Sequence, residues 1–108
     1  MTKQLLIYDN VAAVDRQKHR QMSIRQTTSF AFAKGVNSVP IVDVEFSRAC
    51  VEMPIVFAKT DTGLVSLALL GTQQQDNAFV DADDNWTGRY VPAFFRRYPF
   101  VFAVQEDS

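Results

Sequence analysis

Arginine and aromatic side chains that could bind an anion gather near the C-terminal end of the chain, at Trp86, Arg89, Tyr90, Arg96 and Arg97. Guanidinium groups bind phosphate or carboxylate through paired N–H donors, and aromatic rings can stack on a planar ligand. We therefore predict that any bound anion lies near Arg89, Arg96 or Arg97. The competing interpretation, which the sequence favours, is that these arginines pair with Asp81, Asp83 and Asp84 in the acidic turn at residues 81–85.

That acidic turn is the nearest approach to a metal motif. Asp81, Asp83 and Asn85 occupy the first, third and fifth positions of a calcium-loop pattern. The pattern then fails, because Trp86 stands where the loop needs glycine and Pro92 where it needs a bidentate glutamate. We therefore expect a solvated hairpin turn and no metal site.

The residue types that most enzymes require are scarce. His19 is the one histidine and Cys50 the one cysteine, so the usual zinc ligand set cannot be assembled. His19 has cationic neighbours, and the chain contains no Gly-x-Ser-x-Gly elbow, P-loop or dinucleotide fingerprint. We expect no catalytic residue, no cofactor and no enzymatic activity, so assignment as a hydrolase or metalloenzyme should prove wrong.

The elements that must position these residues are short. Apolar runs predict strands at residues 4–8, 29–33, 42–46, 55–58, 64–70, 78–80 and 100–104. Residues 61–63 supply a hairpin turn, and the strand at 64–70 is apolar on both faces, which is typical of a central strand. Residues 15–25 could be a solvated helix or a loop. The fold class expected is α+β, with short antiparallel strands and two or three short helices.

Two helices are predicted from spacing and from proline. Phe46, Ala49, Cys50 and Met53 fall on one helical face, which makes Cys50 a small buried hydrophobe rather than a nucleophile. Just before them, Val42, Val44 and Phe46 alternate with two acidic residues, as in a strand with one wet face. A second helix should begin at Pro92 and end before Pro99.

Length and charge narrow the class of protein. The 108 residues fit a single domain, and a net charge of −1 argues against a dedicated nucleic-acid-binding protein. The charge is uneven: residues 1–35 carry six Lys/Arg and two Asp/Glu, whereas residues 36–85 carry two and eight. We expect these segments to face each other.

No apolar run approaches the roughly 20 residues of a membrane span or resembles a secretory signal. A cytoplasmic location is expected, with surface association only by a non-Sec route.

Nine pieces of the chain, in order and spacing, carry a family resemblance: residues 5–8, 37–40, 45–49, 54–58, 68–71, 77–81, 86, 90–93 and 96–100. Together they resemble the N-terminal part of the SapC family of bacterial proteins. The resemblance implies association with a paracrystalline surface layer (S-layer). It implies no catalytic residues. Family members continue into a C-terminal half, so we expect this chain to be the N-terminal portion of a longer architecture.

The sequence therefore predicts a non-enzymatic structural or interaction module of the SapC type, occupying residues 1–108 as one domain. The alternative is a cytoplasmic accessory domain that binds a small molecule, a peptide or a carrier for a neighbouring enzyme of the tryptophan-halogenase type. A protein partner or a homodimer is expected. The segment at residues 90–104 should form that contact, because its last strand is apolar on both faces.

Overall fold

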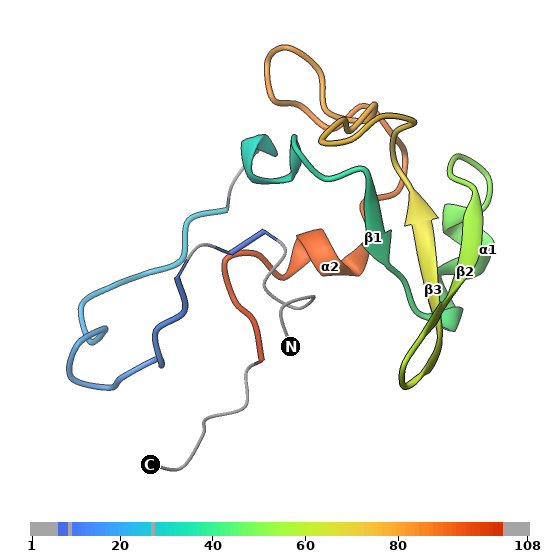
Figure 1. The fold of residues 1–108 in the computed structure, drawn as a ribbon. Coiled ribbons are helices and arrows are strands. Elements are labelled where there is room, and N and C mark those ends of the chain that lie inside the picture. Colours follow the sequence, from blue (N-terminus) through green and yellow to red (C-terminus); the bar gives the residue numbers. More distant parts are fainter. Residues whose placement is uncertain (1–6, 9, 27, 103–108) are drawn as a thin grey trace.

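The sheet is built around the predicted hairpin. In the computed structural model, which describes residues 7–8, 10–26 and 28–102, strand β2 (Ile55–Thr60) pairs antiparallel with β3 (Gly63–Leu69) (Figure 1). Strand β1 (Ser38–Pro40) pairs antiparallel with the other edge of β3, so the order is β1-β3-β2. The central position of β3 is confirmed. The sequence did not predict β1, because three residues ending in proline give no periodic signal.

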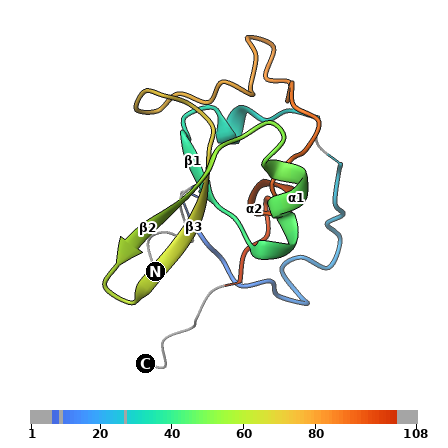
Figure 2. The same cartoon turned by 90° about the vertical axis from the view of Figure 1, so that its right-hand side faces the viewer.

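The hairpin extends away from both helices (Figure 2). Its two-residue loop is closed by Gly63, whose φ of 133° is a backbone conformation that side chains other than glycine rarely adopt. The hydroxyl of Thr60 donates to the carbonyl of Gly63 at 2.7 Å and so fixes the turn.

Both predicted helices exist, each as a single turn. Helix α1 (Phe46–Ala49) buries Ala49, and the turn after it buries Met53. Helix α2 (Ala93–Arg96) begins directly after Pro92. With one three-stranded sheet and two short helices, the fold is α+β, as predicted. No helix within the described ranges is long and apolar enough to cross a membrane.

The strand predicted at residues 42–46 is wrong. Residues Asp43–Glu45 form a 3₁₀ turn, in which the amide of Glu45 donates to the carbonyl of Val42. The burial is the reverse of the expected pattern: Val42 and Val44 are exposed, and Glu45 is buried. Hydrogen bonds donated to the Glu45 carboxylate compensate for its burial, so hydrophobicity alone does not decide which side chain is buried here.

Three further predicted strands are corrected. Residues Ala31–Ala33 form a 3₁₀ turn because each closing amide donates to a carbonyl three residues back. Residues 78–80 contribute only an isolated bridge between Val80 and Trp86. Residues 100–102 are irregular, and residues 103–104 lie outside the described part of the chain. The predicted strand at 4–8 falls largely outside it as well, and Ile7 and Tyr8 are not in a strand.

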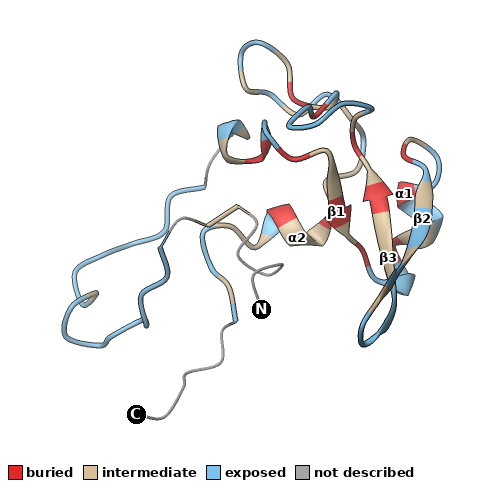
Figure 3. Ribbon diagram, in the orientation of Figure 1, coloured by how far each residue is buried: buried red, intermediate tan, exposed pale blue. Residues whose placement is uncertain are grey.

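The core lies where β1 and β3 meet the two helices (Figure 3). Its most deeply buried side chains include Val39, Met53, Ala68, Leu70 and Phe95. An aromatic cluster extends this core: the Trp86 ring stacks on Phe79 at 5.3 Å and contacts Phe95 at 5.8 Å between ring centroids. By contrast, residues 10–26 lie away from the sheet and are almost entirely exposed (Figure 3).

Candidate functional site

Glu45, in the 3₁₀ turn that leads into α1, holds the segment that leads into α2. Its side chain is only 5% exposed. One carboxylate oxygen accepts the hydroxyl of Tyr90 and the amide of Ala93, the latter at 2.8 Å, and the other accepts the amide of Val42 at 2.9 Å. A buried carboxylate with three donors is well compensated.

These contacts shift two ionisation equilibria. Burial alone would raise the pKa of Glu45, but the hydrogen bonds from Tyr90 and from the amides of Val42 and Ala93 outweigh burial and hold this pKa below its ordinary value. Burial, followed by the neighbouring Glu45 carboxylate, raises the pKa of the Tyr90 phenol. At neutral pH the pair is therefore an ionised carboxylate and a protonated phenol.

Glu52, just beyond α1, binds the same segment through its backbone. Its carboxylate accepts the amide of Arg89 at 2.7 and 2.9 Å and the amide of Tyr90 at 3.2 Å. Gly88 permits this approach, because a Cβ there would lie 2.9 Å from the Phe79 ring and 3.0 Å from the Glu52 carboxylate. Both carboxylates are thus occupied by the protein's own donors.

Three guanidinium groups lie near Tyr90, and none of them forms an ion pair with a carboxylate of the described residues. Arg48, from α1, and Arg89 line an open hollow of about 360 Å³ together with Tyr90 and Glu52. Arg96 lies over the Tyr90 ring at 5.5 Å and donates to its hydroxyl at 3.3 Å. Among the residues that the structure describes, the one ion pair is Lys34 with Asp84, at 2.9 Å. We call Arg48, Arg89, Tyr90 and Arg96 the arginine–tyrosine surface.

The structure brings together three of the five predicted site residues, namely Arg89, Tyr90 and Arg96. Trp86 belongs to the core instead, and its indole N–H donates to the carbonyl of Tyr90 at 3.0 Å. Arg97 lies over the Phe94 ring at 4.4 Å and lines a separate hollow beside Glu45. Its buried Nε has no hydrogen-bond partner among the described residues.

Sequence reasoning missed Arg48. The signal for it was indirect: Arg48 lies between Phe46 and Ala49 in the predicted helix, so it had to face away from the core. Nothing in the linear sequence placed that solvent face beside residues 89–96, which are about forty positions further along the chain.

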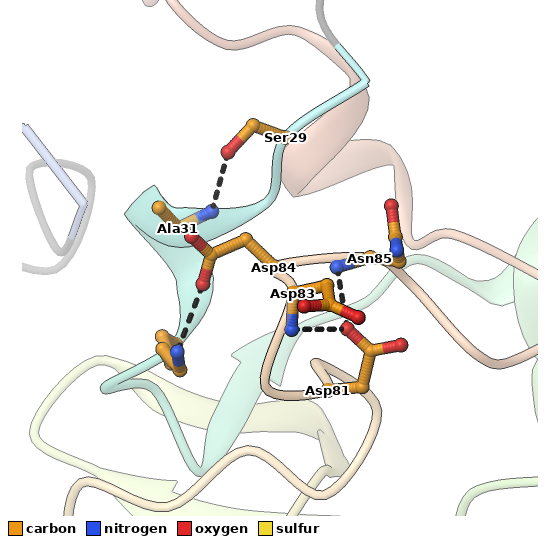
Figure 4. Close-up of polar contacts among 7 residues, drawn as sticks. Ser29, Ala31, Asp81, Asp83, Asp84 and Asn85 are labelled. Carbon is orange, nitrogen blue, oxygen red and sulfur yellow. Dashed lines mark hydrogen bonds and ion pairs between the residues drawn. The ribbon is translucent and has the colours of Figure 1, made fainter.

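The acidic turn is held by its own backbone (Figure 4). One carboxylate oxygen of Asp81 accepts the amides of Asp83 and Asn85, each at 2.9 Å. The expected pairing of this turn with Arg89, Arg96 and Arg97 is wrong, because Asp84 pairs with Lys34, which joins the basic and acidic segments. Within the described ranges, no group of three or more His, Cys, Asp and Glu residues could hold a metal ion.

His19 and Cys50, the two remaining residues considered for catalysis or metal binding, each form a contact within a local turn. The Nδ1 atom of His19 accepts the amide of Asp15 at 2.8 Å, which closes a turn in the exposed segment. Cys50 is exposed, and its thiol lies 3.7 Å from the carbonyl of Ser47. The prediction that Cys50 is buried is therefore wrong: α1 ends at Ala49, so Cys50 leaves the apolar face.

Comparison with known proteins identifies a family. The model of a protein family described as SapC matches residues 14–108, which include every residue of the arginine–tyrosine surface. No curated protein matches this chain. No solved structure matches it either.

Proposed function

This chain belongs to the SapC family, and from that premise we propose that it is a non-enzymatic structural or interaction module that binds an anionic partner through the arginine–tyrosine surface. The partner we propose is a component of a paracrystalline surface layer, as the resemblance to the family implies. Carboxylate or phosphate groups on that partner would be its points of contact.

The observation that supports this proposal is the saturation of Glu45 and Glu52 by internal donors. Backbone amides and the Tyr90 hydroxyl occupy both carboxylates, and among the described residues neither carboxylate forms an ion pair with an arginine. An arginine fork binds a planar oxyanion through two N–H groups, and hydrogen bonds between charged groups are stronger than neutral ones. The positive charge of Arg48, Arg89 and Arg96 is therefore available to an external anion.

The test is co-sedimentation of the purified protein with isolated surface-layer sheets. Each charged hydrogen bond contributes about 1.5–3 kcal/mol, so replacing both Arg48 and Arg89 by Gln should weaken binding at least tenfold. Binding should also fall as salt is raised from about 50 to 500 mM, because exposed charges are screened. Arg20→Gln, in the exposed segment, is the matched control and should bind like the wild type.

Absence of sedimentation, or equal binding by the double variant and the wild type, would contradict the proposal. Cell fractionation gives an independent check. Recovery of the protein only with the cytosolic fraction would favour the alternative, an accessory domain that serves a neighbouring enzyme.

A further inference from the structure

An open groove of about 670 Å³ lies on the other side of Arg96, between residues 24–26 and α2. Seven of its ten lining residues are apolar or aromatic, Ile24, Val91 and Pro99 among them. Pockets for small molecules commonly enclose about 300–1,000 Å³ and combine an apolar lining with a few polar groups. The groove has the size and the lining of such a site.

The aromatic part of the lining is fixed by the core. Phe32 and Tyr98 stack face to face, with ring centroids 4.0 Å apart and an angle of 4° between the planes. The edge of Phe95, which is 1% exposed, contacts Phe32 at 6.1 Å. Rings held in this way are already in place before a ligand binds, which lowers the entropic cost of binding.

The charges on the groove have a single sign. Arg25 and Arg96 are its charged lining residues, and no carboxylate of the described residues lines it. Arg96 is oriented by the Tyr90 ring beneath it and by its hydrogen bond to the Tyr90 hydroxyl. A ligand that fills this groove must therefore combine an apolar body with a negative group.

We propose that the groove binds a small amphipathic carboxylate. The apolar part lies on the rings of Phe32 and Tyr98, and the carboxylate accepts hydrogen bonds from Arg25 and Arg96. This site shares Arg96 with the arginine–tyrosine surface but needs neither Arg48 nor Arg89, so it does not depend on the function proposed above.

Isothermal titration with decanoate, below the concentration at which it forms micelles, tests the site. Decan-1-ol has the same alkyl chain with no charge, and decyltrimethylammonium has the same chain with a positive charge. We expect both to bind at least tenfold more weakly than decanoate.

Arg25→Gln and Arg96→Gln should each weaken decanoate binding about tenfold. Both side chains are exposed, so these variants should fold normally. Arg20→Gln, which does not line the groove, should leave binding unchanged.

Equal affinity for decanoate and decan-1-ol, no measurable binding of decanoate, or unchanged affinity in both arginine variants would each overturn the proposal. The double variant at Arg48 and Arg89 separates the two sites. It should bind decanoate like the wild type even though it loses the surface-layer interaction; a parallel loss of decanoate binding would mean that the groove is not an independent site.

Discussion

Glu45 is buried, although the hydrophobic pattern of the sequence predicts that its neighbour Val44 is buried instead. Val44 is 81% exposed, whereas the Glu45 side chain is 5% exposed. The three donors from Val42, Tyr90 and Ala93 compensate the carboxylate for lost water. Glu45 therefore joins two parts of the chain that are far apart in sequence, and it supports the backbone from which Arg89 and Arg96 project.

We predict that Glu45→Gln destabilises the protein by about 1–3 kcal/mol at pH 7, because an amide replaces a charged acceptor and directs an N–H group at existing donors. The folded pKa of Glu45 lies below its unfolded value, so its ionised form stabilises the fold above the unfolded pKa, and this contribution disappears as the pH falls through the folded pKa. Urea denaturation of both proteins between pH 3 and pH 7 measures the difference, which should be largest near pH 7 and shrink in acid.

Asp43→Asn is the control for this prediction. Asp43 lies in the same 3₁₀ turn but is exposed, and replacement of an exposed side chain usually changes stability by less than about 0.5 kcal/mol. If the difference between Glu45→Gln and the wild type is independent of pH, the hydrogen-bonded carboxylate is not the source of the stability.

At the scale of elements, the hairpin depends on its turn. Gly63 has a φ of 133°, and a Cβ at this position would meet no atom within 4 Å. The cost of Gly63→Ala would therefore come from the backbone conformation alone, at about 1–3 kcal/mol. Chemical denaturation should show this loss.

Gly35→Ala provides a matched comparison, because its Cβ would also meet no atom and its φ is not positive. It should cause no loss of stability, and the reduced entropy of the unfolded chain could add up to about 1 kcal/mol. Equal losses at Gly35 and Gly63 would show that the φ of Gly63 does not limit the substitution.

The elements that local signals could predict are those with a strong period or a clear boundary. The hairpin around Gly63 and the helix that starts at Pro92 are of this kind. The alternation at residues 42–46 failed because a contact with Tyr90, 45 residues away, decides the burial of Glu45. The sequence did not predict Arg48 as a site residue for the same reason: the contact between α1 and residues 89–96 is tertiary, and no local pattern encodes it.

At the scale of the whole molecule, two of the places where large apolar side chains are exposed could form a protein contact. Phe100 is 45% exposed and Phe102 is 90% exposed, both beyond α2. On the hairpin, Phe57 is 62% exposed and Leu64 is 71% exposed. Exposed apolar surface commonly marks a protein contact where it is contiguous. The two places are separate, so substitutions can distinguish between them.

We predict that the protein forms a homodimer through the segment at residues 90–104, with Phe102 at the contact. In a symmetric dimer each copy buries the same side chain, and burial of one phenylalanine contributes about 1.5–3 kcal/mol. Phe102→Ser should therefore raise the dissociation constant about a hundredfold or more.

Light scattering after size-exclusion chromatography, at high micromolar protein concentration, should show the wild type as a dimer and Phe102→Ser as a monomer. Leu64→Ser removes another exposed apolar side chain, from the hairpin, and should remain a dimer. A monomeric wild type would refute the prediction, and a dimer broken by Leu64→Ser but not by Phe102→Ser would place the contact on the hairpin instead.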